Sequence, residues 1–509
     1  PVIKRISITL LIGIILGGCG TLPNEVKHSP EKSTPHSSSS LSELRDVYST
    51  EQSVADTSGV LFQNTGWEAL AQRLALVESA EHSIDIQYYI WNSDISGQYL
   101  ASRLISAADR GVEVRVMLDD INLNEREDLL VYLDSHPKID IRVFNPTPNR
   151  SGVAKWLSVL GDFSRLNRRM HNKSFTVDGA WSVVGGRNIG DEYFDLSDEI
   201  NFRDRDVLVT GPVVNDIQAS FVDYWDSQWS YPVELLGGDA ALGVPEANSI
   251  MIPSYRNYPD LPQSKPEANR YMHELAKNMK WVKASFTYDS PVPLDETNTS
   301  EPKETAQLLS KLAQQSEHEV LLESAYLIFD DPQLEEWDEL ASRDVDIKAL
   351  TNSMASNDLT TNHSGYAGRR KDMLENGIQL FELKPETSLC EESTRDESKC
   401  APTLAYGLHA KSAVFDRKIA SVGSFNFNLR STYLNTESIL VIEDESVAQS
   451  LALDIENAMN EDNSWYLDLK EGDVYWHSEG KSWDSEPETG NWERFQSRFL
   501  QLIPIEKYL

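Results

Sequence analysis

The segment HNKSFTVD at residues 171–178 has a second version, HAKSAVFD, at residues 409–416. In both versions a lysine follows the histidine by two positions and an aspartate follows it by seven. A glycine stands fourteen positions after each histidine, and an asparagine stands seventeen positions after it. One short pattern of this kind can arise by chance, but two versions with matching glycines and asparagines indicate an internal duplication.

The spacing within each version predicts a strand that carries polar groups on one face. Side chains two positions apart in a strand point to the same side, so the histidine and the lysine are expected to project together. The aspartate then opens a turn into a second strand, and the following glycines let the backbone lie close to a ligand. The asparagine is thereby expected beside its own histidine. The candidate catalytic residues are His171, Lys173, Asp178, His409, Lys411 and Asp416, and the candidate substrate-binding residues are Asn188, Asn426 and Ser424.

Two such versions, packed about a pseudo-twofold axis, would bring two imidazoles, two ammonium groups and two carboxamides together. This set suits a phosphodiester, because one neutral imidazole can attack phosphorus while the other, protonated, gives a proton to the departing alkoxide. The lysines and asparagines would hold the nonbridging oxygens and stabilise the charge there. The expected intermediate is a covalent phosphohistidine that a hydroxyl group or water resolves. The scheme needs no metal ion and no cofactor.

Helical and strand-like segments alternate around the motifs, in the same order twice. Residues 112–118 carry apolar side chains at every second position, which is typical of a strand, and residues 345–350 repeat the pattern. The alternation predicts an α/β fold of two similar halves, each a mixed, mainly parallel sheet with helices on both faces. The active site is expected at the pseudo-twofold interface. Helices are expected at 67–79, 99–110, 129–135, 305–315, 334–342 and 369–376, and strands at 84–91, 112–118, 139–144, 320–329, 345–350 and 378–383.

The first residues have the pattern of an export signal. Lys4 and Arg5 precede an apolar stretch over residues 6–16, and small residues lead to Cys19. This ending resembles a bacterial lipobox, in which the cysteine is acylated and becomes the first mature residue; the alternative is a short buried helix with a chance cysteine. Acyl chains attach a protein to a membrane without spanning it. Gly20 is not the aspartate of the inner-membrane sorting pattern, which implies the periplasmic face of the outer membrane.

The composition restricts the class of partner. The chain has 509 residues, of which 46 are basic and 81 acidic, for a net charge of −35 at pH 7. Such a charge repels polyphosphate, so a nucleic-acid partner is not expected. Hydrophobic residues make up 40% of the chain, which is ordinary for a globular protein and excludes wholesale disorder.

Three cysteines occur in the chain. With Cys19 assigned to a lipid, Cys390 and Cys400 remain as a pair in a polar stretch. In an oxidising compartment their spacing suits a surface disulfide. Two free thiols are the alternative, and a zinc site is disfavoured because no neighbouring residues complete a set of four ligands.

The chain is expected to have five parts. Residues 20–55 are rich in proline and serine, which predicts a flexible tether, with an ordered extension packed on the body as the alternative. Residues 232–302 are rich in proline, glycine and asparagine, which is typical of a linker or insertion. The full division is a signal peptide at 1–19, the tether at 20–55, a first domain at 56–231, the linker at 232–302, and a second domain with a C-terminal tail at 303–509.

These motifs resemble the phospholipase D superfamily, with its duplicated histidine-lysine-aspartate motif, from about Thr65 to the carboxyl end. Finer features resemble the C-type cardiolipin synthases. They are DIQYYIW at 85–91, DFSRLNRRM at 162–170, GGRNIG at 185–190, GSFN at 423–426, RS at 430–431, LNTE at 434–437 and LIPIE at 502–506.

The resemblance implies two similar phospholipase D-like domains and transfer of a phosphatidyl group between phospholipids, with phosphatidylglycerol and phosphatidylethanolamine as candidate substrates and cardiolipin as the product. By the same resemblance, His171 is the nucleophile and His409 its acid–base partner. Acidic residues further along each half are expected to orient the histidines. Glu437 fits this role in the second half and Asp204 fits it in the first, with Asp206 as a competitor.

Three other functions are alternatives for a chain with these residues. A phospholipase D hydrolase would employ them with water as the acceptor and release phosphatidic acid, since exclusion of water depends on the shape of the pocket. A nucleic-acid phosphodiesterase is disfavoured by the net charge. A catalytically dead binding protein is disfavoured because both motifs are complete.

Overall fold

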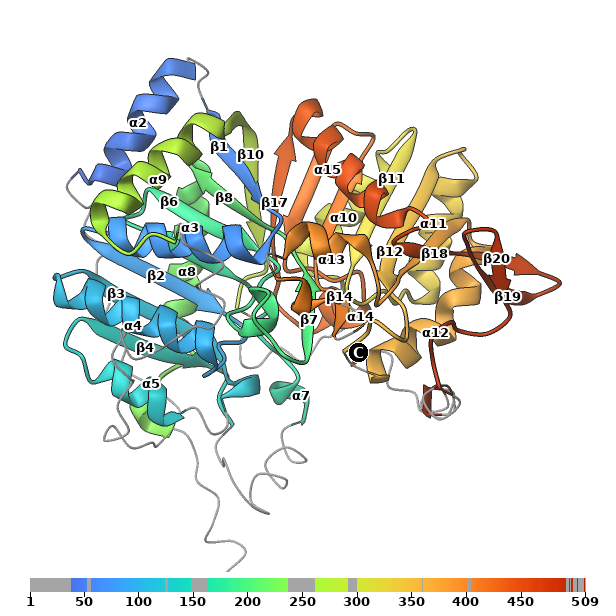
Figure 1. Cartoon of the computed structure of the whole chain (residues 1–509), viewed down its shortest axis with the longest axis horizontal. Helices are drawn as coiled ribbons and strands as arrows, with labels where there is room; N and C mark the ends of the chain where they lie inside the picture. The colour runs from blue at the N-terminus through green and yellow to red at the C-terminus, as the bar shows by residue number, and fades with distance from the viewer. Residues whose placement is uncertain are drawn as a thin grey trace, which may run out of the picture.

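The computed structural model describes residues 38–52, 56–123, 127–147, 163–236, 261–291, 300–358, 360–394, 396–400 and 404–490, with residues 402, 494, 496, 497, 501 and 508. In this part of the chain one continuous sheet of 18 strands runs through two halves, and helices cover both of its faces (Figure 1). The part of this sheet in each half is described as the first and the second sheet. The two similar α/β halves that the duplication predicts are therefore confirmed.

The first sheet has the strand order β1-β8-β6-β5-β2-β3-β4-β9. Helices α3 and α4 pack on one face, with α5 beside β4, and α8 packs on the other. The strands are β1 (Ser58–Gln63), β2 (Ser83–Tyr88), β3 (Glu113–Asp119), β4 (Ile139–Phe144), β5 (Ser174–Val177), β6 (Trp181–Gly185), β8 (Asp206–Thr210) and β9 (Ser230–Pro232), and the helices are α3 (Gly66–Ser79), α4 (Ile95–Asp109), α5 (Glu127–Asp134), α7 (Phe163–Leu166) and α8 (Val213–Trp225), with short 3-10 turns η1 (Asp120–Asn122), η2 (Asp191–Tyr193) and η3 (Val233–Leu236).

The second sheet repeats this order as β10-β17-β16-β15-β11-β12-β13-β18 and adds the hairpin strands β19 and β20. The strands are β10 (Lys280–Tyr288), β11 (Glu319–Ser324), β12 (Asp346–Asn352), β13 (Ile378–Leu383), β15 (Lys411–Phe415), β16 (Ile419–Gly423), β17 (Ser438–Glu443), β18 (Ser464–Lys470), β19 (Asp473–Ser478) and β20 (Lys481–Trp483), and the helices are α10 (Glu304–Gln314), α11 (Asp331–Ala341), α12 (Thr360–Glu375), α13 (Ser388–Ser393), α14 (Leu429–Tyr433) and α15 (Glu445–Met459), with the 3-10 turn η6 (Glu397–Lys399).

The expectation of mainly parallel sheets is wrong. Within each half only the β2-β3-β4 and β11-β12-β13 pairings are parallel, and all other pairings of the two sheets are antiparallel. The cause lies in the motif strands, which are hairpins. Asp178 and Gly179 turn β5 into β6 with positive φ angles, and Asp416 and Arg417 do the same between β15 and β16. A tight turn joins neighbouring strands antiparallel, whereas parallel neighbours need a crossover.

The predicted linker contains the strand that joins the halves. β10 pairs antiparallel with β1 of the first sheet through Val60 and Lys280, and with β17 of the second through Phe286 and Leu440. Helix α9 (Lys265–Asn278) precedes it and packs on α3. Residues 265–288 are thus part of the body, because α9 buries Ala268, Met272 and Ala276 at helical spacing.

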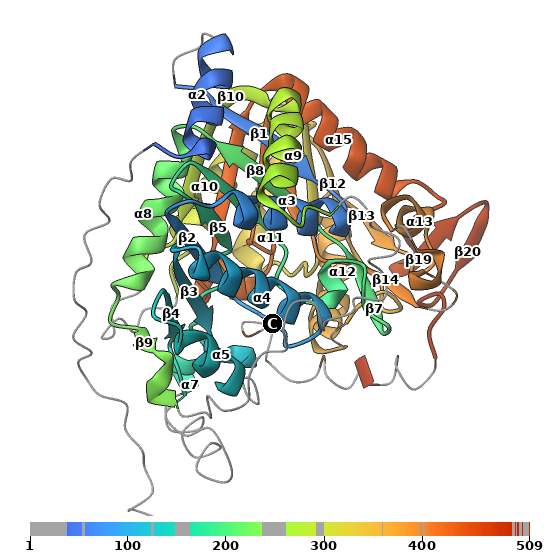
Figure 2. The same cartoon turned by 60° about the vertical axis from the view of Figure 1, so that its left-hand side comes forward.

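The predicted tether is also shorter than expected. Helix α2 (Ser40–Gln52) buries Leu41 and Leu44 against the first half (Figure 2). The indole Nε1 of Trp181 donates to the carbonyl oxygen of Leu41 at 2.9 Å. For residues 40–52 the ordered extension is therefore the correct alternative. Residues 1–37, with Cys19, lie outside the described residues.

The helices in the described part of the chain are those of a globular body. No helix there combines the length and the apolar character that a bilayer crossing needs.

Cys390 and Cys400 form a disulfide with their Cα atoms 5.8 Å apart. Their expected surface location is wrong, since both cysteines are buried in a cluster with Tyr406 and Leu408. Tyr406 and Leu408 belong to β14 (Ala405–Leu408), which pairs with β7 (Ile200–Arg203) of the first half. The disulfide thus braces a strand pair that connects the halves.

Candidate active site

The two motif histidines lie where the halves meet, and the backbone of each is bonded to the other half. His171 N donates to Thr436 O at 2.9 Å, and Thr436 N donates back to Arg169 O at 2.9 Å. His409 N donates to Arg203 O at 2.8 Å, next to the pairing of β7 with β14. His171 lies three residues before β5 and His409 lies two residues before β15, so the starts of the two motif strands converge on the interface.

A carboxylate from the opposite half orients each imidazole. Nδ1 of His171 lies 2.7 Å from Oε2 of Glu437, and Nδ1 of His409 lies 2.5 Å from Oδ2 of Asp204. The predicted orienting residues are both present, but each serves the histidine of the other half and not of its own. Neither imidazole is oriented by its carboxylate until the two halves are packed together.

Glu437 is held by a ring of neutral donors. Its carboxylate accepts from Ser424 Oγ at 2.5 Å, Ser431 Oγ at 2.7 Å and Asn435 Nδ2 at 3.4 Å, besides His171. Burial raises the pKa of Glu437, but attraction to His171 and other donors holds it below its usual value. Ser424, predicted to bind substrate, instead fixes this carboxylate.

A residue that the sequence analysis did not single out holds Glu437 from behind. Oδ2 of Asp289, at the end of β10, accepts from Glu437 N at 2.9 Å, and Asp289 N donates to Glu437 O at 2.9 Å. Thr305 in turn donates to Asp289 through its backbone N and its Oγ1. The predicted linker therefore contributes a support for the His171 side of the site.

Asp204 has a different setting. Its Oδ1 accepts from Arg205 N at 2.7 Å and lies 2.4 Å from where a Cβ of Gly186 would stand. Any side chain at Gly186 would displace this carboxylate, which explains the glycine where the second half has Ser424. The competitor Asp206 pairs with Arg73 at 2.8 Å instead, so it does not orient a histidine.

Burial keeps both imidazoles neutral. It lowers the pKa of His171 to about 4 and that of His409 to about 3, against the opposing pull of the carboxylates. With Nδ1–H donated to the carboxylate, the lone pair of each ring is on Nε2. The resting site therefore presents two Nε2 atoms, either of which can attack phosphorus or accept a proton.

The motif lysines lie beside their histidines as the strand spacing predicts. Nζ of Lys173 donates to His171 O at 2.6 Å, and Nζ of Lys411 donates to His409 O. Burial lowers the pKa of Lys173 to about 7 and that of Lys411 to about 8. An ammonium has three N–H groups, so each lysine can also contact a phosphate oxygen.

Asp178 and Asp416 are not at the site, which corrects their assignment as catalytic. Seven residues of extended chain separate each from its histidine, a distance of about 20 Å. Asp178 accepts from the backbone N atoms of residues 81, 82 and 83, and Asp416 from those of residues 317, 318 and 319. Both aspartates thus tie a motif hairpin to the start of the neighbouring strand, β2 or β11.

The two asparagines differ in what they bind. Asn188 Oδ1 accepts from Ile90 N at 3.2 Å, and its Nδ2 donates to the hydroxyl of Tyr193 at 3.0 Å. Oδ1 of Asn426 is buried and has no hydrogen-bond partner among the described residues. The carboxamide of Asn426 therefore has an acceptor oxygen without a described partner, whereas Nδ2 of Asn188 keeps a second N–H that no described hydrogen bond uses.

Aromatic rings cover both imidazoles, and the sequence analysis did not assign them. The Tyr89 ring contacts His171 edge-on with centroids 4.8 Å apart. The ring centroid of Tyr193 lies 5.0 Å from that of His409, and the ring centroid of Phe202 lies 5.5 Å from it. Tyr89 lies in a segment rich in aromatic residues, and this pattern could have identified it from the sequence. Tyr193 belongs to the first half but contacts His409 of the second, a contact that spacing in the sequence does not reveal.

Metal ligation was also considered. Among the described residues, no three histidine, cysteine, aspartate or glutamate side chains are grouped so that they could hold a metal ion. The metal-free scheme stays a prediction.

The matches to known proteins agree with this geometry. The model of the cardiolipin synthase, phospholipase D-like domain family matches residues 74–225 and again 309–459, one segment in each half. Cardiolipin synthase C of Escherichia coli K12 is 37% identical over 86% of this chain and 93% of its own length. An uncharacterised protein of Helicobacter pylori 26695 is 30% identical over 83% of each chain.

Solved structures share the fold. Phosphatidylserine synthase of Haemophilus influenzae Rd KW20 aligns with a TM-score of 0.58 at 14% identity, over 91% of this chain and 100% of that chain. Since the family model matches both halves and a relative at 37% identity covers most of the chain, the protein belongs to the cardiolipin synthase family of phospholipase D-like proteins.

Proposed function

We propose that the protein transfers a phosphatidyl group from one phospholipid to the hydroxyl group of another. The observation that carries this proposal is the pair of neutral imidazoles, each oriented through Nδ1 by a carboxylate of the other half. Two such rings provide a nucleophile and a proton donor on opposite sides of one phosphorus atom.

In the first step, Nε2 of His171 attacks phosphorus and the bond from phosphorus to the headgroup oxygen breaks. His409 gives its Nε2 proton to that oxygen, and the headgroup leaves as an alcohol. A phosphodiester anion beside His409 favours the charged imidazolium and so raises the low pKa of His409. Lys173 and Lys411 balance the charge on the nonbridging oxygens.

In the second step, His409 takes the proton from the hydroxyl group of an acceptor lipid while that oxygen attacks phosphorus. The bond between phosphorus and Nε2 of His171 breaks, and both imidazoles return to their starting states. The acceptor lipid now carries the phosphatidyl group. Water in place of the lipid hydroxyl would make the same site a hydrolase.

The names of the relatives support cardiolipin as the product. Cardiolipin synthase C of Escherichia coli is, by its name, a cardiolipin synthase, and so is a 25% identical protein of Clostridium perfringens SM101. For this chain the substrates are phosphatidylglycerol and phosphatidylethanolamine, and the product is cardiolipin. The net charge of −35 argues against a nucleic-acid substrate.

The test is incubation of the detergent-solubilised protein with mixed phosphatidylglycerol and phosphatidylethanolamine, with the products identified by mass spectrometry. Cardiolipin supports transfer, and omission of each lipid in turn identifies donor and acceptor. Phosphatidic acid as the sole product would instead establish the hydrolase.

The location of the protein is part of the proposal. The lipobox-like segment ending at Cys19 supports a lipid anchor at the periplasmic face of the outer membrane. Mass spectrometry of the N-terminal peptide of the membrane-extracted protein tests it. An unmodified Cys19 in a mature protein that needs no detergent contradicts it.

A further inference from the structure

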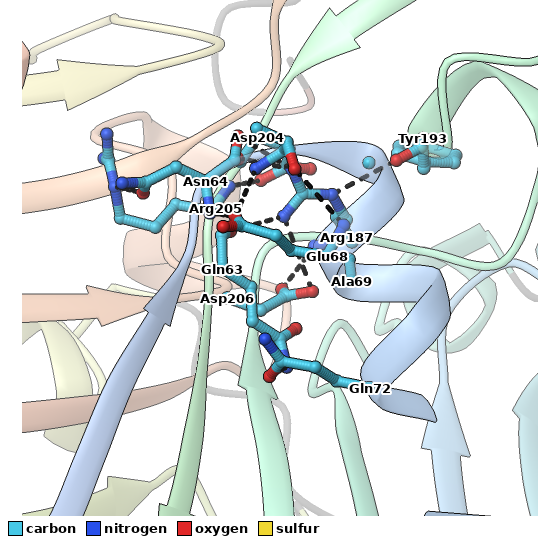
Figure 3. Close-up of polar contacts among 12 residues, drawn as sticks. Gln63, Asn64, Glu68, Ala69, Gln72, Arg187, Tyr193, Asp204, Arg205 and Asp206 are labelled. Atoms are coloured by element: carbon cyan, nitrogen blue, oxygen red, sulfur yellow. Dashed lines mark hydrogen bonds and ion pairs between the residues drawn. The ribbon is translucent and has the colours of Figure 1, made fainter. Parts of the chain in front are cut away.

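Arg187 is a fully buried arginine at the end of β6, one position before Asn188 (Figure 3). Its guanidinium group is completely engaged with neighbouring acceptors. Nε donates to Tyr193 O at 3.1 Å, Nη1 donates to Gln63 O at 2.9 Å and lies 3.7 Å from Asp206 Oδ2, and Nη2 donates to Asp204 O at 2.7 Å and Asn64 O at 3.3 Å.

Two of these acceptors belong to residues that contact His409. The carboxylate of Asp204 binds Nδ1 of that imidazole, and the ring of Tyr193 contacts the imidazole in a T-shaped arrangement. Asp204 and Tyr193 reach His409 from different segments, and Arg187 joins the two segments through their carbonyl oxygens. One guanidinium group therefore sets where both neighbours of the imidazole stand.

The fold itself does not require an arginine here. The residue sixteen positions after His409 in the second half is Phe425, and it packs in the apolar core below α10 and α11. On that side the carboxylate of Glu437 is held directly by serine and asparagine side chains. Asp204 has a backbone amide as its other donor, so its position depends on the segment that Arg187 holds.

We infer that Arg187 is a positioning residue for proton transfer by His409. It fixes Asp204 and Tyr193 so that the imidazole keeps its Nδ1 bond and directs Nε2 at the departing headgroup oxygen. The inference rests on the proposed function in one respect, namely that His409 protonates the leaving group. Lysine cannot replace the arginine, because an ammonium group lacks the planar fork that spans carbonyls in several directions.

The experiment compares two leaving groups in the full-length protein. Release of ethanolamine or glycerol from the phospholipids needs a proton, whereas release of p-nitrophenol from phosphatidyl-p-nitrophenol does not. In the first turnover, before the acceptor reacts, Arg187→Lys is expected to slow headgroup release by about 100-fold, the usual contribution of a general acid, and p-nitrophenol release by only a few fold. The pH profile of headgroup release is expected to change shape as well.

Arg73→Lys is the matched control. Arg73 is equally buried and pairs with the same Asp206, but its other partners are Gln63, Ala69 and Tyr88. Among the described residues it donates no hydrogen bond to Asp204 or Tyr193, so its variant should change both rates by the same factor. Arg187→Gln, assayed below the melting temperature of the variant, provides a second reading if Arg187→Lys is unstable.

Equal slowing of both substrates by the Arg187 variants would overturn the inference and leave Arg187 a structural residue. So would a difference between substrates that Arg73→Lys reproduces. Failure of the proposed function looks different, because the wild-type protein would then form no phosphatidyl product from either lipid. Release of p-nitrophenol by a hydrolase would still allow the comparison of leaving groups.

Discussion

His171 and His409 occupy matching places in the two halves, yet their surroundings are built from different chemistry. The carboxylate of Glu437 accepts hydrogen bonds from two serines and an asparagine besides its bond to His171. Asp289 binds the backbone of Glu437. Asp204 reaches His409 with a backbone amide as its other carboxylate donor, and Arg187 holds it through its carbonyl oxygen. A duplicated motif has thus acquired one imidazole fixed by neutral hydrogen bonds and one fixed through a buried cation.

The difference suits a division of roles. A nucleophile needs a fixed position against phosphorus, and the many direct bonds to Glu437 provide it. An acid–base group must exchange a proton in each step, and the less encumbered carboxylate of Asp204 can balance the imidazolium that forms. The comparison therefore favours His171 as the nucleophile and His409 as the proton carrier.

Removal of either imidazole tests the roles with the largest expected effect. His171→Ala and His409→Ala should each lower headgroup release from phospholipids by at least about 1,000-fold, because covalent and acid–base catalysis are lost. With phosphatidyl-p-nitrophenol only His409→Ala should recover a substantial rate of p-nitrophenol release in the first turnover, measured by absorbance as a burst, because resolution of the adduct still needs His409. Recovery by His171→Ala instead would exchange the two roles.

Neutralising the orienting carboxylates should be almost as damaging. Glu437→Gln and Asp204→Asn each lower phospholipid turnover by about 100- to 1,000-fold, since a wrongly oriented imidazole cannot act. Single-turnover experiments separate them: Glu437→Gln should abolish the covalent adduct, and Asp204→Asn should still form it from phosphatidyl-p-nitrophenol. If Glu437→Gln impaired only the proton-transfer steps, the assignment of Glu437 to His171 of the other half would be wrong.

The glycine and serine at matching positions provide a direct exchange. Gly186→Ala places a methyl group 2.4 Å from Asp204 Oδ1 and should lower turnover about 100-fold. Ser424→Ala removes one of several donors to Glu437 and should cost only about tenfold. Kinetics of the two variants, with melting temperatures as the control for folding, check this order, and equal losses would remove the proposed asymmetry.

The buried histidines should also make stability depend on pH. The pKa of His171 in the folded protein, about 4, lies below its usual value of 6.5, so the unfolded chain binds more protons between these values. The free energy of unfolding should therefore rise with pH from 4 to 6.5, by at most about 3 kcal/mol from this residue. Urea titrations of His171→Gln beside the wild type measure the difference, and identical pH slopes would contradict the low pKa.

Asp178→Asn and Asp416→Asn should have the smallest effect on catalysis. Each loses charged hydrogen bonds to a β-strand start, for a cost of about 1–2 kcal/mol in the free energy of unfolding. Turnover per folded molecule should stay within a few fold of the wild type. A loss comparable to that of Asp204→Asn would return these aspartates to the catalytic site.

Local patterns made much of the fold predictable. The order of helices and strands follows from periodicity over six to fifteen residues, and the expected segment 139–144 matches β4. The histidine and lysine of each motif also share a face as their spacing requires. The antiparallel pairing was not predicted, although the Asp178-Gly179 turn was, because the alternation of elements was given more weight than the hairpin.

Contacts between residues of different halves could not be predicted from the spacing of residues in the sequence. Glu437 and Asp204 were chosen from their place in the sequence, but which histidine each serves depends on how the halves pack. The role of Ser424 depends on the same packing. Composition was misleading at residues 265–288, where turn-forming neighbours concealed the helical spacing of Ala268, Met272 and Ala276 and the strand after it.

The central claim is that His171, oriented by a carboxylate of the other half, carries the phosphatidyl group between lipids. The most direct measurement is a rapid quench of the protein with phospholipid substrate in alkaline denaturant, which preserves the acid-labile bond between phosphorus and nitrogen, followed by mass spectrometry of its peptides. The account predicts a phosphatidyl adduct on the peptide that contains His171, more abundant in His409→Ala with phosphatidyl-p-nitrophenol and absent in Glu437→Gln. An adduct on the peptide that contains His409, or turnover with no adduct on either, would contradict it.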